Sequence, residues 1–151
     1  DDGVNCTKRT SGTTVEFNEL IYGNSTFVAA GDNGTILTSS NGTSWTSRTS
    51  GTTNALYGGT YTDSNEDGVK EFVLVGASGK ILSSKDDGAS WSSVSLTSMT
   101  TGNVLGIVRG GKTWVIVGAS GYISTISDGE SDVTTRTSGT SQSLRRVFYK
   151  E

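Results

Sequence analysis

The stretch Phe27-Val-Ala-Ala-Gly-Asp-Asn-Gly-Thr-Ile-Leu37 joins two short apolar strands through a glycine turn, and it decides the fold because it recurs. Related copies begin with Phe72-Val-Leu-Val-Gly76 and with Trp114-Val-Ile-Val-Gly118. Each copy continues through a Gly-Ala-Ser-Gly turn into another β-branched stretch. The chain is therefore built on an internal repeat, which has to be identified before any other element is assigned.

A second marker fixes the length of the repeat. Arg9-Thr-Ser-Gly-Thr-Thr14 returns at 48–53 and, with one change, at 136–141, which gives a period of roughly 40 residues. Each period contains four short β-prone stretches. Four antiparallel strands, the last leading through Ser-Gly-Thr into the next repeat, form the plan of a β-propeller blade. The predicted strands are A (near Leu20, Thr60, Ile107), B (Phe27, Phe72, Trp114), C (Ile36, Ile81, Ile123) and D (Trp45, Trp91, Val133).

The predicted fold class is all-β, with three complete four-stranded antiparallel blades at 15–47, 48–93 and 94–135. Residues 1–14 are interpreted as the outer strand and crossover of a preceding blade, and 136–151 as the first strand of a following blade. Such orphan strands leave open edges, which are templates for pairing. Either the chain is one part of a longer propeller, or neighbouring chains supply the missing strands.

The composition agrees with many short strands around a thin, distributed core. Hydrophobic residues make up 32%, and the 21 Gly with no Pro favour tight turns between short strands over helices. The formal charge of -3 offers no basic surface for a phosphate backbone, so a nucleic-acid partner is not expected. No apolar run approaches the roughly 18 residues that a membrane span requires.

One turn carries a family resemblance. Ser84-Lys-Asp-Asp-Gly-Ala-Ser-Trp91 matches the Asp-box, S-x-D-x-G-x-[ST]-W, also called the BNR repeat. Weaker copies are seen at 38–45 and 125–132, with Ser40 and Ser127 in place of the Asp. With the strand pattern, the motif resembles the repeats of sialidase-like and photosystem II assembly-factor-like propellers. The resemblance implies the fold, while function has to be argued from a site.

The resemblance favours a non-catalytic scaffold for protein binding or assembly. Asp86 is expected to accept backbone N–H bonds within its own turn. A sialidase-like glycoside hydrolase is the remote alternative, but the chain has no His, no Phe-Arg-Ile-Pro segment and no convergent arginine cluster, so no enzyme activity is predicted. The other alternative is a structural subunit of a virion, filament or surface appendage that self-assembles through open blade edges.

The A–B hairpin of the second repeat is six residues longer than its counterparts and reads Asp63-Ser-Asn-Glu-Asp-Gly-Val-Lys-Glu71. This D-x-N-x-D-G-x-x-E spacing supplies the oxygen ligands that Ca²⁺ requires, and it resembles the calcium hairpins of integrin-type propellers. A solvated acidic loop is the alternative. The predicted structural Ca²⁺ ligands are Asp63, Asn65, Asp67 and Glu71 through their side chains and Val69 through its carbonyl.

Arg9, Arg48 and Arg136 occupy one position in successive repeats and are the predicted partner-binding residues. The assembly-factor resemblance implies an arginine patch; the alternative is that each Arg holds its own crossover by local pairing. Asn24 heads an N-x-[ST] sequon and is a candidate glycan site. A calcium loop of this kind agrees with an extracellular, cell-surface or periplasmic location. The lone Cys6 aligns with Trp45, so it is interpreted as a small packing residue, with an intermolecular disulfide as the alternative.

Overall fold

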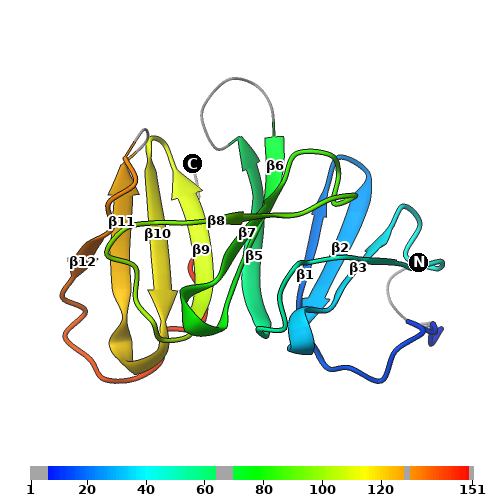
Figure 1. Ribbon diagram of the computed structural model, residues 1–151, viewed down its shortest axis with the longest axis horizontal. Coiled ribbons are helices and arrows are strands. Elements are labelled where there is room, and N and C mark those ends of the chain that lie inside the picture. Colours follow the sequence, from blue (N-terminus) through cyan, green and yellow to red (C-terminus); the bar gives the residue numbers. More distant parts are fainter. Residues whose placement is uncertain (1–6, 64–69, 128–129, 150–151) are drawn as a thin grey trace.

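The computed structural model describes residues 7–63, 70–127 and 130–149, and within them the chain forms three separate four-stranded antiparallel sheets (Figure 1). We call these sheets blades 1, 2 and 3. Blade 1 contains β1 (Phe17–Gly23), β2 (Thr26–Gly31), β3 (Ile36–Ser39) and β4 (Thr46–Arg48). Blade 2 contains β5 (Leu56–Asp63), β6 (Lys70–Gly76), β7 (Ile81–Ser84) and β8 (Ser92–Val94). Blade 3 contains β9 (Val104–Gly110), β10 (Thr113–Gly118), β11 (Ile123–Ser127) and β12 (Thr134–Arg136).

The predicted strand equivalence is confirmed by the pairing register. Phe27 pairs with Ser39, Phe72 with Ser84 and Trp114 with Ile126, so the three aromatic residues hold the same place in their sheets. In every blade the strands follow one another in chain order, as successive hairpins require.

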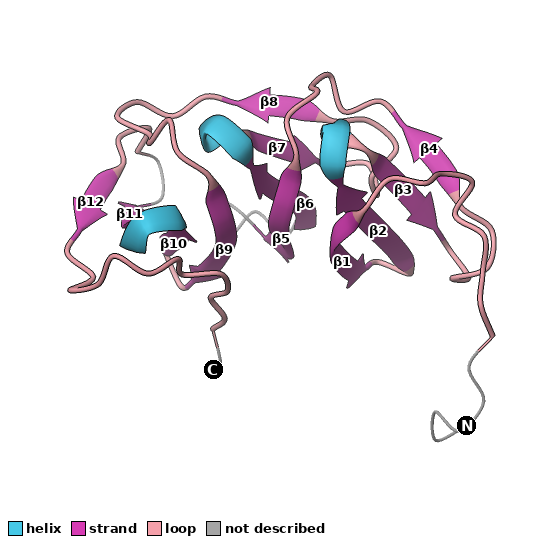
Figure 2. Cartoon of the chain, turned by 90° about the horizontal axis from the view of Figure 1, so that it is seen from below, coloured by secondary structure: helices cyan, strands magenta, loops and turns pink. Residues whose placement is uncertain are grey.

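The three sheets are arranged side by side as a fan. Figure 2 shows β1, β5 and β9 along the inner side of the arc and β4, β8 and β12 along the outer side. Each glycine turn after the second strand is a short 3-10 turn, and the described residues contain no α-helix. None of the described helical segments has the length or apolar character to cross a bilayer.

The predicted orphan strands are not found in the described residues. Residues 137–149 are irregular, although Gly110 lies against the Tyr149 ring and the Leu144 N–H donates to the Gly118 carbonyl (2.9 Å), so this segment follows β9. Residues 7–16 are also without strand pairing, and 1–6 lie outside the described part of the chain. A strand is defined by a ladder of backbone hydrogen bonds, and the described residues of neither segment form one, although 145–149 lie alongside β9.

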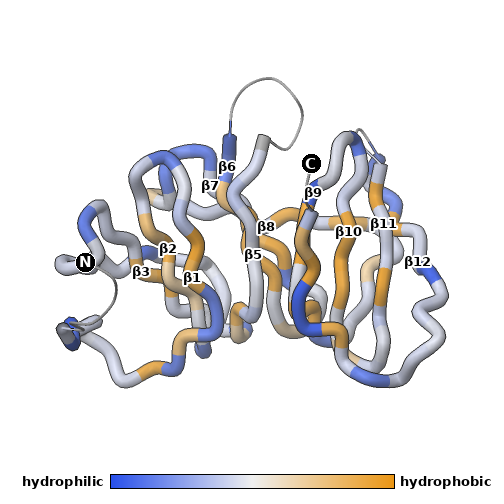
Figure 3. The backbone as a smooth tube through the Cα atoms, turned by 180° about the vertical axis from the view of Figure 1, so that it is seen from behind, coloured by the Kyte–Doolittle hydropathy of each residue, from blue (hydrophilic) through white to orange (hydrophobic). Residues whose placement is uncertain are grey.

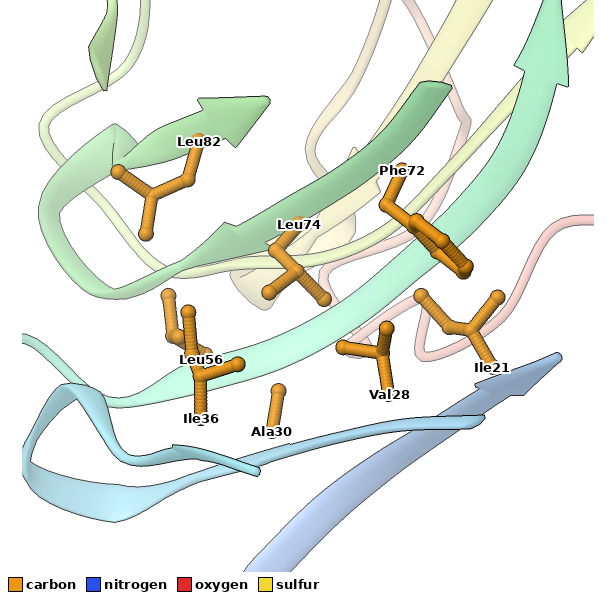
Figure 4. Close-up of a cluster of buried hydrophobic side chains, with 8 residues drawn as sticks. All are labelled: Ile21, Val28, Ala30, Ile36, Leu56, Phe72, Leu74 and Leu82. Carbon is orange, nitrogen blue, oxygen red and sulfur yellow. The ribbon is translucent and has the colours of Figure 1, made fainter. Parts of the chain in front are cut away.

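Strand β6 supplies side chains to two separate cores, because successive residues of a strand point to opposite faces. Phe72 and Leu74 belong to the core between blades 1 and 2, which is drawn in Figure 4. Val73 and Val75 belong to the core between blades 2 and 3. The first core is made by Ile21, Val28, Ala30, Ile36, Leu56, Phe72, Leu74 and Leu82, and the second by Val73, Val75, Ile81, Val104, Ile107, Ile116, Ile126 and Val133.

The apolar segments lie mainly in the inner and middle strands of the blades, although most of β5 is of intermediate hydropathy (Figure 3). The outer strands are polar: every residue of β8 and of β12 is exposed. A low hydrophobic total therefore suffices for folding, because the buried hydrophobic residues are concentrated where one blade covers the next.

The two repeated segments of the sequence, the glycine turn and the Arg-Thr-Ser-Gly-Thr crossover, contact each other in the structure. Gly34, at the end of the glycine turn, has φ +66°, and a Cβ there would collide with the carbonyl oxygen of Thr52 in the Arg-Thr-Ser-Gly-Thr crossover. The crossover is itself held by the Ser50 hydroxyl, which donates to the Thr52 carbonyl (3.1 Å). The same approach recurs between Gly79 and Thr100 and between Gly121 and Thr140. The glycine is needed for its conformation and for the close backbone contact.

Candidate functional site

Asp86 organises the turn between β7 and β8, as the sequence predicts. Its carboxylate accepts hydrogen bonds from the Ser84 hydroxyl (2.8 Å), the Ser90 N–H (2.9 Å) and the Ser90 hydroxyl (2.5 Å). The Ser90 hydroxyl and then the Ser90 N–H lower the pKa of Asp86 to about 2, because they bond to the charged carboxylate. All of its oxygen contacts lie within its own turn, which is a structural arrangement.

Replacing Asp86 by Ala should destabilise blade 2 by about 1 kcal/mol, the usual effect of losing a capping carboxylate at an exposed site. Since the folded pKa of about 2 lies below the ordinary value near 4, this stabilisation is present above pH 4 and is lost as the pH falls from about 4 to 2. Urea unfolding at pH 6 and at pH 2 measures both effects. Lys85→Ala, an exposed change in the same turn, is the control; an Asp86→Ala difference that persists at pH 2 contradicts the assignment.

The corresponding turn in blade 1 differs from its predicted alignment. Because Phe27 pairs with Ser39, Ser39 is the counterpart of Ser84. Asn41, rather than Ser40, then accepts the N–H bonds of Thr43 (2.8 Å) and Ser44 (2.9 Å). The turn is one residue shorter than in blade 2, since strand pairing fixes the strands while the loop between them can change length.

In blade 3 the register also shifts the predicted alignment by one residue. Thr125 pairs with Thr134 as Ser83 pairs with Ser92, so Val133, not Asp132, is the counterpart of Trp91. Ile126 is likewise the counterpart of Ser84, which makes Glu130 the counterpart of Gly88. Asp128, at the Asp86 position, lies outside the described residues, and Ser127 does not take that position.

Between blades 1 and 2, the turn of blade 2 fills the interface. A Cβ on Gly88 would lie 2.9 Å from Thr38 Cγ2 and 3.3 Å from Val28 Cγ2 of blade 1. The Trp91 ring packs against the same core, and its Nε1 donates to the Gly88 carbonyl (3.1 Å). A glycine and an indole together close this interface.

Between blades 2 and 3, the larger Glu130 and the smaller Val133 replace that glycine and indole. Val133 is 7% exposed and packs in the second core, but it has no ring to reach Val73 and Ser83, the counterparts of Val28 and Thr38. A cavity of about 200 Å³ remains, which we call the blade 2/3 pocket. It is lined by Glu71, Val73, Ile81, Ser83, Val94, Leu96, Ile107, Trp114, Ile126, Ser127 and Glu130.

Glu71 lies in this pocket and belongs to β6, where it pairs with Thr62. Asn65, Asp67 and Val69, together with the side chain of Asp63, lie outside the described residues, so the calcium hairpin stays a prediction. Among the residues that are described, no three His, Cys, Asp or Glu side chains come together in a metal-holding group.

The three predicted partner-binding arginines are not brought together. Arg48 ends β4 and Arg136 ends β12, and each Nε donates to a threonine hydroxyl of the adjacent strand, Thr38 (2.8 Å) and Thr125 (2.9 Å). Arg9 is exposed before β1. Two of the arginines therefore hold their own sheets, in line with the local-pairing alternative, and a role in partner binding stays a prediction.

Asn24, the candidate glycan site, lies exposed in the β1–β2 hairpin. Its side-chain amide donates to the Asp87 carboxylate of blade 2 (2.8 Å), so it links the loops of two blades. Glycosylation stays a prediction, and a glycan on this amide would compete with that bond. Cys6 lies outside the described residues.

Comparison with known proteins bears on the fold. No protein-family model matches the chain, and no curated protein matches its sequence. Two similar solved structures are YCF48 bound to a D1 peptide, with 17% identity and a TM-score of 0.61, and YCF48 from Cyanidioschyzon merolae, with 14% identity and a TM-score of 0.62. The three sheets are propeller blades.

The alignments cover 87% and 89% of this chain and 42% and 47% of the two YCF48 chains. The chain therefore spans less than half the length of these propeller proteins. At this level of identity the likeness establishes the architecture and leaves the binding residues to be argued from this chain's own side chains.

The sequence interpretation missed the blade 2/3 pocket. The signal was present in the third repeat, where a bulky acidic residue and a valine follow Ile126 at the spacing at which Gly88 and Trp91 follow Ser84. Only the strand register reveals this correspondence, because the turns of the three blades differ in length and composition.

Proposed function

We propose that this chain is a non-catalytic propeller scaffold that binds a segment of a partner protein. The observation that carries the proposal is the shared fold with YCF48, which has been solved with a bound D1 peptide, across 87% of this chain. Two further features support it. The Asp86 carboxylate is used within its own turn. Among the described residues, five large hydrophobic side chains lie exposed: Leu20, Tyr22, Val94, Phe148 and Tyr149.

A display library of random 12-residue peptides, selected against the folded protein, tests this proposal. Binding peptides should share a motif and should bind with micromolar affinity, as expected for a short segment on a preformed surface. Failure to enrich any peptide, with folding verified by circular dichroism, would argue against a peptide-binding scaffold. Light scattering on the same sample addresses the alternative structural subunit, which requires concentration-dependent assembly.

We also propose a structural Ca²⁺ ion in the hairpin of blade 2, and with it an extracytoplasmic location where calcium is abundant. The support is the D-x-N-x-D-G-x-x-E spacing in a hairpin six residues longer than its counterparts. With a Kd of about 10⁻⁵–10⁻³ M, the ion should raise the Tm of the protein.

Replacing Asp63 and Asp67 together by Ala should abolish that calcium-dependent rise in Tm, since two of the four side-chain ligands are lost. Ser64→Ala, which changes the loop without removing a proposed ligand, should leave it intact. The proposal is wrong if titration calorimetry shows no heat at millimolar Ca²⁺ and EDTA leaves the Tm of the unaltered protein unchanged.

A further inference from the structure

We propose that the blade 2/3 pocket binds one basic side chain, arginine or lysine, of a partner protein, with its aliphatic stem against the apolar walls and its cationic group between Glu71 and Glu130. The inference deepens the proposed peptide-binding function and rests on it for the source of the side chain. The pocket itself is argued from its size, its walls and its charge.

The size of the pocket suits a single side chain. Its volume of about 200 Å³ lies below the roughly 300–1,000 Å³ of sites for drug-sized ligands. It lies slightly above the roughly 150 Å³ apolar cavity that accepts a benzene-sized molecule. An occupant of a few carbon atoms with a small head group fits these limits.

The walls of the pocket are apolar on both sides. Val73 and Ile81 face it from blade 2, and Ile107 and Ile126 face it from blade 3, all of them buried. Trp114 adds a half-buried indole ring. Methylene groups of a lysine or arginine stem gain free energy from such walls while the charged end stays near the mouth. An indole face also attracts a cation within about 6 Å.

The charge of the pocket is negative. Glu71 is only 6% exposed, and no hydrogen bond or ion pair joins its carboxylate to another described residue. Glu130 lines the same pocket from the turn of blade 3 and is exposed at the mouth. A carboxylate placed among apolar side chains gains from a cationic partner, so a ligand that supplies a cation is favoured over a neutral or acidic one. Glu71 is also one of the proposed Ca²⁺ ligands, and its carboxylate cannot serve the ion and the probe at once, so the probe is titrated in EDTA.

The neighbouring interface shows why the pocket is particular to blades 2 and 3. There, Gly88 and Trp91 occupy the positions of Glu130 and Val133, and the indole packs in the core between blades 1 and 2. The same fold thus closes one interface with an aromatic ring and leaves the next one open and acidic. This contrast also supplies the test, because Val133→Trp should fill the pocket from within.

The test uses the full chain labelled with 5-fluorotryptophan, which gives one fluorine resonance each for Trp45, Trp91 and Trp114. The probe is the peptide acetyl-Gly-Arg-Gly-amide. It should shift the Trp114 resonance in a saturable manner, with a Kd of the order of 1 mM, as suits a single anchored side chain. The Trp45 and Trp91 resonances should stay unchanged.

Three controls separate the pocket from general attraction to an acidic protein. The norleucine counterpart of the probe should bind at least ten-fold more weakly. Glu71→Gln with Glu130→Gln, which preserves the shape, should weaken the arginine probe at least ten-fold. Val133→Trp should abolish the Trp114 shift. Glu16→Gln with Asp87→Asn, which removes the same number of charges from exposed residues that do not line the pocket, should leave the affinity for the arginine probe within two-fold.

The inference is overturned if the arginine probe leaves Trp114 unchanged at 20-fold above the expected Kd (about 20 mM), or if the norleucine and arginine probes bind equally. It is also overturned if the Gln pair binds the probe as well as the unaltered protein does. Should Val133→Trp fail to fold, the Gln pair alone decides.

Peptides from the display library distinguish the two levels of the proposal. If selected peptides bind Val133→Trp and the Gln pair as tightly as the unaltered protein, the pocket assignment fails and the peptide-binding function stands. If no peptide is selected while the arginine probe still shifts Trp114, the pocket stands and the peptide-binding function fails.

Discussion

Replacing Phe72 by Ala should lower the free energy of unfolding by about 3–5 kcal/mol, the largest loss expected from any single change in the chain. Phe72 is 0% exposed and belongs to the core between blades 1 and 2, where it lies beside Ile21 and Val28 (Figure 4). The centroid of its ring also lies 4.6 Å from that of Tyr61, and the two rings are tilted by 43°. Removing it leaves a cavity that two rigid sheets cannot close, and urea unfolding measures the loss.

Leu20→Ala is the matched control, because Leu20 is a strand residue that is 59% exposed. It should change the free energy of unfolding by less than about 0.5 kcal/mol. If both substitutions had a similar, small effect, the packing between blades 1 and 2 would contribute little to the free energy of unfolding.

Replacing Gly34 by Ala should destabilise the chain by about 2–4 kcal/mol. Part of this, about 1–2 kcal/mol, is the cost of a left-handed backbone for a residue with a side chain. The remainder comes from the collision of the new methyl group with the Thr52 carbonyl and the Ser50 hydroxyl, which forces the crossover away from the turn.

Gly51→Ala separates the two contributions. Gly51 has φ +70°, nearly the same as the +66° of Gly34, but a Cβ there would meet nothing within 4 Å. Its substitution should cost only the conformational part, about 1–2 kcal/mol. Equal losses for the two glycines in thermal or urea unfolding would show that the crossover contact is unimportant.

The fold could be predicted because its signal repeats. Phe27, Phe72 and Trp114 each begin an apolar strand that ends in a glycine turn, and a period of roughly 40 residues leaves room for four short strands and little else. Any one copy is ambiguous by itself. Three copies at a regular interval are not, because the turns and the apolar positions must agree in each.

Details that depend on pairing could not be predicted. The sequence aligned Ser40 and Asp132 with Asp86 and Trp91, whereas hydrogen-bonded register gives these places to Asn41 and Val133. A hairpin loop can gain or lose a residue without moving its strands. An alignment based on motif residues alone cannot detect such a change in loop length. The terminal stretch at 144–149 was predicted as a strand from its own residues, but a strand also needs a partner.

The candidate site was harder to foresee than the fold for the same reason. Val73 and Trp114, far apart in the sequence, become opposite walls of one cavity only when two blades are placed side by side. Glu71 was assigned to the hairpin by its spacing to Asp67, while its burial among valine and isoleucine side chains follows from its place in β6. Local spacing identifies candidate ligands, and tertiary packing determines what surrounds them.

The alternation of β6 also bears on how such a chain can change over evolution. Phe72 and Leu74 pack in the core shared with the preceding blade, whereas Val73 and Val75 pack in the core shared with the following one. Among related sequences, the first pair should therefore vary together with Val28, and the second pair should vary independently of it. The two faces of such a blade fit different neighbours through different residues. The blade can therefore be duplicated, or given a new neighbour on one side, while the residues that fit its old neighbour are retained.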